Sequence, residues 1–218
     1  MDGAKQAIGL TVVIDVFRAF TTDAYVLANG ALCIFPVKTV EEAIKLKEQH
    51  PSWILMGERG GKKIPSFDYG NSPYIVKNVD FNGCKVIQTT SAGTQGLLNS
   101  YHAEEILPGS FVIADAIVNY IKMKDPKIVS IVAMGWEGKE MTPEDESLAE
   151  YIELKLKGEE PDFHSMKKRI RTHPQGAKFF DPMQSLFREG DFHCALDINR
   201  FNFCLKLVKS AQPYIIKF

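Results

Sequence analysis

Three clusters of charged and hydroxyl-bearing side chains each stand directly after a short apolar run of the sequence. The first cluster, in the stretch IDVFRAFTT, contains Asp15, Arg18, Thr21 and Thr22. The second, in GERGGKKIPSFDYGNSP, contains Glu58, Arg59, Asp68, Asn71 and Ser72. The third, in VIQTTSAGTQG, contains Thr89, Thr90, Ser91, Gly93 and Thr94. Because arginines, hydroxyls and free backbone N–H groups bind anions, these residue types favour an anion-binding site.

The third cluster holds more hydroxyl groups than a helix start requires. One Ser or Thr side chain is enough to cap a helix N-terminus, whereas four hydroxyls lie between residues 89 and 94. A helix N-terminus also offers unpaired N–H donors and the positive end of the helix dipole. We therefore interpret this stretch as a cradle for an anion rather than as a cap alone.

Asp15 and Arg18 carry the strongest chemical signal of the first cluster. Asp15 lies between Ile14 and Val16, and burying a carboxylate in an apolar strand is costly unless it is paired or binds a ligand. We therefore expect Asp15 in the site. Arg18 follows three residues later, so one loop would present both groups to the same ligand. The alternative is that Arg18 only neutralises Asp15 in an internal ion pair.

The regions around the clusters have the alternating pattern of an α/β fold. Strands are expected over residues 11–16, 31–37, 53–56, 85–88 and 127–134. Helices are expected over 22–29, 93–100 and 114–123, and from Thr39 and Thr142 onward. Such a chain forms a layered α/β fold with a mixed or largely parallel sheet flanked by helices. Because ligands bind beyond the carboxyl ends of such strands, the three clusters should converge on one pocket.

Two helix starts are marked by capping signals. Thr39-Val-Glu-Glu42 matches a capping box. Thr142-Pro-Glu-Asp145 combines a cap hydroxyl, a proline at the first helical position and acidic residues in the first turn. Capping alone would account for Glu144 and Asp145, so a functional role for these acids is one of two interpretations.

The composition argues against several functional classes. The chain has 26 basic and 27 acidic residues and a net charge of −1, so it has no global attraction to nucleic acid or to an anionic membrane. No apolar stretch approaches the roughly 18 residues of a membrane span, and the first residues lack a signal-peptide pattern. We expect a cytoplasmic protein. Because the first expected strand begins only at residue 11, some N-terminal sequence could be missing.

The organisation of the chain indicates one folding unit. After Gly158 the pattern loosens into short basic and aromatic segments, and KKRIR at 167–171 is typical of a solvated helix face. No repeat and no linker divides the sequence. We expect residues 1–218 to form a single unit, either as one body or as two closely packed halves. Proteins of this size are commonly symmetric dimers, so a homodimer is expected.

The cysteines offer one alternative chemistry. They are Cys33, Cys84, Cys194 and Cys204. They form no CxxC pair, which favours reduced thiols over a disulfide framework or a zinc site. The stretch from His193 to Arg200 has the HCx5R spacing with which cysteine phosphatases wrap phosphate. It lacks the glycine of such a loop and contains Asp197, which would repel phosphate, so we interpret Cys194 as structural.

Taken together, the clusters resemble the 2-phosphosulfolactate phosphatase family, the magnesium-dependent enzymes of coenzyme M biosynthesis. The segments that carry the resemblance are VVIDVFRAFTTDAYVLANGA, MGERGGKKIPSFDYGNSP, VIQTTSAGTQG, TPEDESLAEYI, THPQGAKFF and GDFHCALD. They occur in the order found in the family and span nearly the whole chain, from Thr11 to about Asp197. Each segment is weak alone, whereas the set is specific.

The resemblance implies a phosphohydrolase that uses Mg²⁺ and releases inorganic phosphate from a small phosphorylated sulfonate. The catalytic residues implied are Asp15, Arg18, Glu58 and Arg59. The substrate-binding residues implied are Thr21, Thr22, Asp68, Asn71, Ser72, Thr89, Thr90, Ser91, Gly93 and Thr94. The expected Mg²⁺ ligands are Asp15, Glu58 and Asp145. Mg²⁺ prefers one or two carboxylates, with waters and substrate phosphate completing its shell.

Two other functions remain open from the sequence. The chain could hydrolyse a different small phosphorylated carboxylate, or it could bind small anions without catalysis. Acids in the candidate loops, namely Asp15, Glu58 and Asp68, favour an enzyme, because an anion-binding protein needs no carboxylate to hold a metal. Direct attack by water is preferred over a phospho-enzyme at Asp15, since the first cluster lacks a second aspartate for acid–base work.

Overall fold

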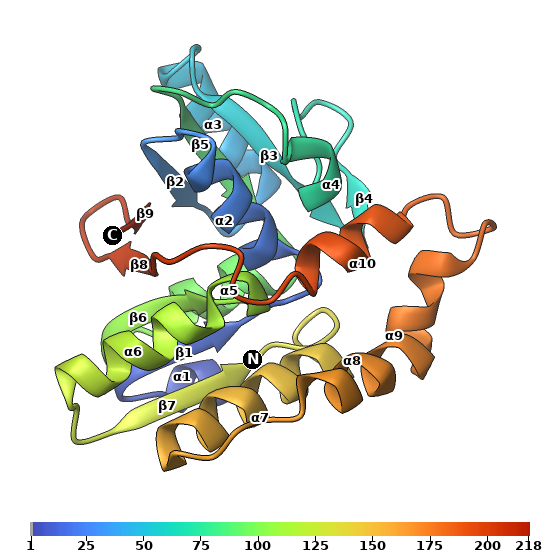
Figure 1. Ribbon diagram of the computed structural model, residues 1–218. Helices are drawn as coiled ribbons and strands as arrows, with labels where there is room; N and C mark the ends of the chain where they lie inside the picture. The colour runs from blue at the N-terminus through green and yellow to red at the C-terminus, as the bar shows by residue number, and fades with distance from the viewer. Residues whose placement is uncertain (1) are drawn as a thin grey trace.

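Two β-sheets form the centre of the molecule, which a computed structural model describes over residues 2–218 (Figure 1). The first sheet has the order β6 (Ala103–Gly109), β1 (Gly9–Ile14), β7 (Val129–Ala133), and its strands are parallel. The second sheet has the order β4 (Lys62–Lys63), β3 (Ile54–Arg59), β5 (Lys85–Thr89), β2 (Cys33–Pro36), β9 (Tyr214–Lys217), β8 (Leu205–Val208). In it, β3, β5 and β2 are parallel, whereas the flanking strands pair antiparallel.

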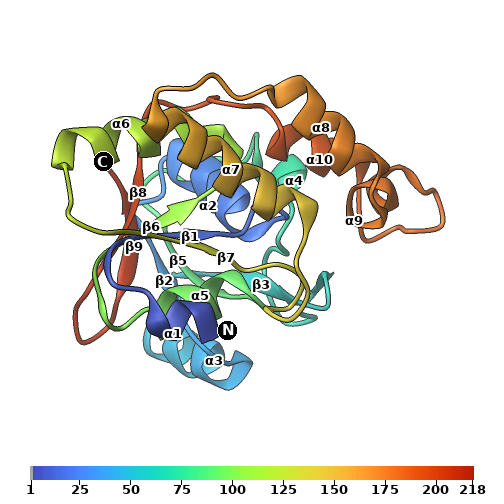
Figure 2. The same ribbon diagram turned by 90° about the horizontal axis from the view of Figure 1, so that it is seen from below.

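Helices cover both sheets, and the predicted layered α/β fold with a mixed or largely parallel sheet is confirmed. The α-helices are α1 (Asp2–Gln6), α2 (Ala19–Ala28), α3 (Val40–Gln49), α4 (Pro73–Val76), α5 (Gly93–Asn99), α6 (Ala114–Lys124), α7 (Pro143–Lys157), α8 (Phe163–Thr172), α9 (Pro174–Ala177) and α10 (Glu189–Ala195). Two short 3₁₀ turns are η1 (Phe111–Ile113) and η2 (Lys178–Phe180). Figure 2 shows α6 and α7 on one face of the first sheet and α1 and α5 on the other. Within residues 2–218, no helix has the length and apolar character needed to cross a lipid bilayer.

The strands lie where apolar runs predicted them. The β1 sequence GLTVVI is buried along its whole length, as a strand between two layers of helices must be. Strand β6 was not predicted, because its sequence AEEILPG contains two glutamates and Pro108. It lies at the edge of the first sheet, where a proline without an N–H is tolerated. Strands β8 and β9 lie in the region that showed no clear pattern.

The two predicted helix starts have different outcomes. At α3, the Thr39 hydroxyl accepts a hydrogen bond from the Glu42 N–H at 3.1 Å, which confirms the predicted cap. At α7, Pro143 is the first helical residue, but the Thr142 side chain makes no capping hydrogen bond. The predicted cap hydroxyl at Thr142 is therefore wrong, although the helix begins where it was expected. The proline and three acidic residues in the first turn mark this start instead.

One large hydrophobic cluster joins the two sheets. It includes Val12 of β1, Ile34 of β2 and Leu205 of β8. A smaller cluster lies beneath α3 and includes Ala43 and Leu55. The shared core fixes the two sheets against each other, so the loops at the carboxyl ends of β1, β3 and β5 keep a constant relative position.

Candidate active site

The loops that follow β1, β3 and β5 meet around a small cavity of about 40 Å³. Its lining residues are Asp15, Phe17, Arg18, Glu58, Gly60, Gly61, Asn71, Ser91, Ala92, Gly135, Trp136, Glu137 and Phe187. All three sequence clusters therefore contribute to one pocket, as the strand arrangement predicted. The loop after β7 and the segment before α10 complete the wall.

Asp15 is one of the residues that line this cavity. Its Oδ1 accepts a hydrogen bond from the Ala19 N–H at 3.1 Å, which fixes the carboxylate against the start of α2. A Cβ at Gly93 would lie 2.8 Å from Asp15 Oδ2, so the absence of a side chain at Gly93 lets the start of α5 approach the carboxylate. Burial raises the pKa of Asp15 to about 6, and the Glu58 carboxylate adds to the rise. Asp15 can therefore hold or release a proton near neutral pH.

Glu58 fastens two of the loops together. Its Oε1 accepts from the Ser91 N–H and its Oε2 from the Gly61 N–H, both at 2.7 Å. The Ser91 hydroxyl lies 3.3 Å from the same Oε2. Glu58 thus orients the loop after β5 against the turn between β3 and β4, while its side chain faces the cavity.

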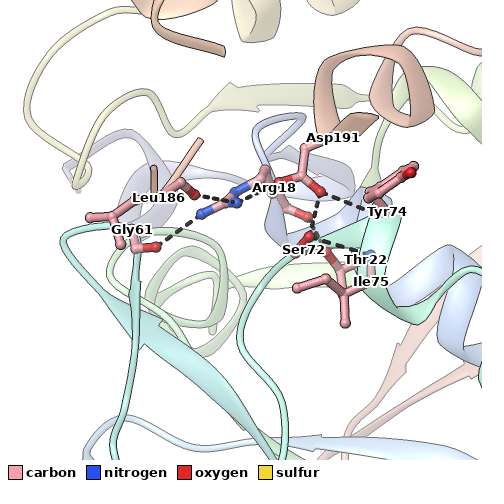
Figure 3. A network of polar contacts seen from close by, with 8 residues as sticks. All are labelled: Arg18, Thr22, Gly61, Ser72, Tyr74, Ile75, Leu186 and Asp191. Atoms are coloured by element: carbon pink, nitrogen blue, oxygen red, sulfur yellow. Dashed lines mark hydrogen bonds and ion pairs between the residues drawn. The ribbon is translucent and has the colours of Figure 1, made fainter. Parts of the chain in front are cut away.

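Arg18 is buried beside the cavity and contacts three separate segments (Figure 3). Its Nη1 donates to Asp191 Oδ2 at 2.7 Å and to the Leu186 carbonyl at 3.2 Å. Its Nη2 donates to the Gly61 carbonyl at 2.9 Å. The sequence left open an internal ion pair between Arg18 and Asp15. This interpretation is wrong, because the carboxylate that pairs with Arg18 is that of Asp191.

Asp191 of α10 is the centre of this network and was missed by the sequence reasoning. Its side chain is fully buried. In addition to Arg18, it accepts hydrogen bonds from the Ser72 hydroxyl at 2.5 Å and from the Tyr74 N–H at 3.1 Å (Figure 3). Asp191 lies in the segment GDFHCALD, which carried part of the family resemblance. Its position in that segment was the one sequence signal that could have indicated a role in the site. Asp191 joins the loop after β1, the start of α4 and α10.

Two adjacent acids at the start of α7 have different environments. Asp145 accepts from the Val16 N–H through one oxygen and from the Gly135 N–H through the other, each at 2.8 Å. It therefore bridges the ends of β1 and β7. Glu144 is also buried, but its Oε2 has no hydrogen-bond partner among the described residues. Burial raises the pKa of Glu144 to about 7, and burial together with Glu144 raises that of Asp145.

Lys178 adds a positive charge behind the aromatic wall of the cavity. Its Nζ lies 3.9 Å from the ring centre of Trp136 and 4.2 Å from that of Phe187. Burial lowers the pKa of Lys178 to about 8, which the Glu144 carboxylate opposes. No sequence pattern indicates a role for this residue, since only the folded chain brings it close to two rings that line the pocket.

The hydroxyl loop after β5 is used mainly inside the protein. Thr90 and Thr94 are buried and paired: the Thr94 N–H donates to Thr90 Oγ1 at 3.0 Å, and the Thr90 N–H donates to Thr94 Oγ1 at 2.9 Å. Thr89 accepts from Arg59 Nη2 at 2.8 Å. Of the four hydroxyl residues, Ser91 is the one that lines the cavity. The hydroxyls of Thr89, Thr90 and Thr94 are therefore engaged within the protein and shape the loop.

Several other residues expected to bind substrate lie outside the cavity wall. The Thr21 hydroxyl donates to the Val16 carbonyl and the Thr22 hydroxyl to the Arg18 carbonyl, each at 2.8 Å, so both stiffen the loop after β1. Asp68 Oδ2 accepts from the Leu55 N–H at 2.8 Å. Leu55 lies at the opposite end of β3 from the cavity, so the structure does not bring Asp68 to the site.

Cys194 is buried in α10 and does not line the cavity. Burial raises the pKa of its thiol, whereas a nucleophilic cysteine needs a lowered one. We expect Cys194→Ser to change kcat/KM for a phosphate ester by no more than a few fold. Steady-state phosphate release by the purified variant measures this. A loss of about a thousandfold in a folded variant would instead identify Cys194 as the nucleophile.

The chain matches the profile of one protein family and resembles several curated proteins. Residues 2–208 match the family described as 2-phosphosulpholactate phosphatase. A protein of Thermotoga petrophila named "Probable 2-phosphosulfolactate phosphatase" is 38% identical over 146 residues, which are 67% of this chain and 62% of that protein. Proteins with the same name from Thermoplasma volcanium and Bacillus subtilis are 35% and 30% identical, over 78% and 93% of this chain and 79% and 89% of their own lengths.

Proposed function

The chain belongs to the 2-phosphosulpholactate phosphatase family, and we propose that it hydrolyses 2-phosphosulfolactate to 3-sulfolactate and inorganic phosphate. The observation that carries the proposal is the meeting of Asp15, Arg18 and Glu58 around one small cavity. In the reaction, water attacks phosphorus, a P–O bond to the water oxygen forms, and the ester P–O bond breaks. One water proton ends on the released alcohol, and the remainder of the water stays on the phosphate.

Arg18 is the principal phosphate-binding group in this proposal. A guanidinium has five N–H donors, and the contacts within residues 2–218 engage three of those of Arg18. The remaining two are free to bind phosphate oxygens, and arginine stays charged at any physiological pH. Asn71 lines the same cavity, and its Oδ1 has no partner among the described residues, so this oxygen can accept a hydrogen bond from a water molecule in the cavity.

Asp15 is the group best placed to orient the attacking water. Its carboxylate lies at the cavity and is held by Ala19. With a pKa of about 6, it is mainly ionised at neutral pH and accepts a hydrogen bond from water. Glu58 supports this arrangement by fixing the loops on both sides of the cavity.

The buried acids also fit a divalent cation. Asp15, Glu58, Glu144 and Asp145 are all buried near one another, and Glu144 Oε2 is left without a partner in the described chain. Within residues 2–218, no three His, Cys, Asp or Glu side chains are arranged to hold a metal by themselves. Mg²⁺ does not need such a cage, because one or two carboxylates suffice when water and substrate phosphate complete the shell. When bound, Mg²⁺ would neutralise phosphate charge.

Asp15 and Glu144 are the acids with the best-suited environments to hold Mg²⁺ in this proposal, with Glu58 and Asp145 as further candidates. We expect Mg²⁺ to stabilise the protein even without substrate, because a cation relieves repulsion among buried carboxylates. At roughly 100 times its Kd, a ligand adds about 2.7 kcal/mol to the free energy of unfolding. For a chain of this size, that is about 5–10 °C in Tm. Thermal unfolding with Mg²⁺ and with excess chelator measures the difference.

The same preparations test whether catalysis depends on the metal. Phosphate release is expected to disappear in excess chelator and to return when Mg²⁺ is added in excess. Full activity with chelator present, together with an unchanged Tm, would remove Mg²⁺ from the proposal. A Tm shift without an effect on activity would make the metal structural only.

The function itself is tested by phosphate release from 2-phosphosulfolactate, with 2-phospholactate and ethyl phosphate as comparison esters. We expect 2-phosphosulfolactate to have the highest kcat/KM. A preference for 2-phospholactate would indicate a phosphatase of another small phosphorylated carboxylate. If no ester is hydrolysed while inorganic phosphate still binds, the protein is an anion-binding protein. Light scattering of the same sample tests the expected homodimer.

A further inference from the structure

We propose that a basic groove beside the cavity binds the sulfonate end of the substrate while the cavity holds only the phosphate. This inference rests on the proposed function and specifies how the substrate would lie. The groove is lined by Lys38, Arg59, Thr90, Ser91, Gln95, Glu137 and Lys139. We call it the basic groove. Its volume is about 390 Å³.

The size of the cavity supports a divided binding site. A cavity needs about 10–15 Å³ to hold one water molecule, so the cavity of about 40 Å³ holds roughly three. A space of this size holds a group no larger than a phosphate. A carboxylate and a sulfonate on the same molecule do not also fit, and the remainder of the substrate must lie outside. Pockets for small ligands are typically about 300–1,000 Å³, which is the range of the basic groove.

The basic groove begins where the cavity ends. Ser91 and Glu137 line both spaces, so a molecule whose phosphate lies in the cavity can extend past them. Glu58 and Arg59 are consecutive residues of β3, and consecutive side chains of a strand point to opposite sides. Glu58 accordingly faces the cavity, whereas Arg59 lines the groove.

The charge of the basic groove suits a monoanionic sulfonate. Three cationic side chains line it, against the single carboxylate of Glu137. That carboxylate already pairs with Lys139, whose Nζ lies 3.2 Å from Glu137 Oε2. The cationic charge of Lys38 and Arg59 is therefore available to a ligand. A sulfonate has three acceptor oxygens. Several donors spread along a groove can therefore bind it better than a single donor can.

Arg59 is held in place before any ligand binds. Its Nη1 donates to the Glu58 carbonyl at 2.7 Å and its Nη2 to Thr89 Oγ1 at 2.8 Å. Gln95 Nε2 donates to the Lys38 carbonyl at 2.8 Å, which ties the two walls of the groove together. A guanidinium fixed in this way loses little conformational freedom on binding, so its contact with a sulfonate contributes more to the affinity of the ligand.

A larger groove elsewhere on the described chain does not suit the same ligand. It lies between α1, β7 and α7, has a volume of about 900 Å³ and contains Glu146, Glu150 and Glu153. Arg169 is its one cationic residue, and it pairs with Glu150 at 2.5 Å. An anionic substrate would be repelled there, and this groove shares no lining residue with the cavity.

The test compares two esters that differ only in the sulfonate. For Arg59→Gln, kcat/KM for 2-phosphosulfolactate is expected to fall about tenfold, mainly through KM, because one charged hydrogen bond is lost. For 2-phospholactate, which lacks the sulfonate, the change is expected to stay within about twofold, because Arg59 lines the groove and not the cavity. The proposal thus replaces the catalytic role that the family resemblance implied for Arg59 with a role in substrate binding. Lys38→Met, which removes the second cation of the groove available to a ligand, should shift the ratio in the same direction. Lys122→Met, at an exposed lysine of α6, serves as a matched control without effect on the ratio.

Two outcomes would overturn the inference while the proposed function stands. Equal losses on both esters would show that Arg59 acts on the phosphate or on the fold, and unchanged ratios in both variants would show that the groove is not used. If the unaltered protein hydrolyses neither ester, the proposed function fails. Calorimetry with sulfoacetate then tests sulfonate binding in the groove without catalysis. Weaker binding of sulfoacetate by Arg59→Gln than by the unaltered protein supports the inference, and equal binding overturns it.

Discussion

Asp15→Asn is expected to lower kcat by about a thousandfold with a much smaller change in KM. Asp15 is the cavity carboxylate with a pKa of about 6, whereas Asp145, the other acid at the end of β1, accepts hydrogen bonds from two backbone N–H groups and does not line the cavity. Asparagine keeps the shape and the hydrogen bond from Ala19, but it can neither hold a proton nor bind a divalent cation as a charged ligand. Steady-state kinetics on 2-phosphosulfolactate with excess Mg²⁺ measures the loss.

The chain offers a matched control for this substitution. Asp23 is another fully buried carboxylate of the same region, but it bonds to Gln88 and does not line the cavity. Burial raises the pKa of Asp23 well above its usual range, so exchanging its carboxyl for an amide removes less charge than the same exchange at an exposed acid. Asp23→Asn is therefore expected to retain activity within about tenfold. Comparable losses in both variants would show a general effect of altering buried acids.

The thermal stability of the same variant adds an independent measure. Without metal, Asp15→Asn should lose little stability, because the removal of a buried charge near Glu58 offsets the loss of the oxygen that accepts from the Gly93 N–H. A stable, inactive variant would place the loss in the chemistry rather than in the fold. Rapid-quench capture of a hydroxylamine-labile phosphoprotein in the unaltered protein would identify Asp15 as a nucleophile and contradict direct attack by water.

The part of the site that the sequence predicted is the part that local patterns determine. An apolar run ending in a charged loop identifies a strand whose carboxyl end can bind a ligand, and β1, β3 and β5 all follow that rule. Because parallel strands bring such ends to one edge, Asp15, Glu58 and Ser91 could be expected to meet. The family resemblance then supplied the reaction that such a pocket would perform.

The rest depends on contacts between distant parts of the chain. Arg18 and Asp191 are 173 positions apart, and nothing in either local sequence indicates that they pair. Lys178 contacts the rings of Trp136 and Phe187, one of which precedes it in the chain and one of which follows it. The sequence reasoning also assumed that the hydroxyls after β5 face a ligand, whereas Thr90 and Thr94 bond to each other. Only tertiary packing decides between these uses.

The adjacent acids at the start of α7 show that the sequence does not determine the environment of a side chain even within one helical turn. Successive helical residues point about 100° apart, so Glu144 and Asp145 cannot share an environment. The capping pattern placed both at a helix start but did not determine which one accepts hydrogen bonds from backbone N–H groups of other loops. In the structure Asp145 is saturated by two backbone N–H groups, whereas Glu144 keeps an unpartnered oxygen. Glu144 thus joins the candidate metal ligands on structural grounds.

Arg18→Lys is expected to lower kcat/KM by about a hundredfold, roughly 2.7 kcal/mol, although it keeps the positive charge. The guanidinium reaches Asp191, Leu186 and Gly61 at once and still has two N–H groups free for phosphate. The lysine ammonium is a compact group without the planar fork of a guanidinium. It cannot satisfy these partners and bind two phosphate oxygens at the same time. Competitive inhibition by inorganic phosphate should weaken in parallel, which a merely structural role would not produce.

Stability must be measured alongside, because Arg18 also joins three segments of the fold. The lysine variant leaves buried carbonyl groups unpaired, and each costs about 1–3 kcal/mol of unfolding free energy. Ser72→Ala weakens the same network from its other side, by removing the hydroxyl that donates to Asp191 Oδ1, and leaves the guanidinium in place. We expect Ser72→Ala to lose less than about tenfold in kcat/KM at a comparable loss of stability. If the two variants instead lose activity equally for equal loss of Tm, Arg18 serves the network alone and the phosphate must be bound by other groups of the cavity.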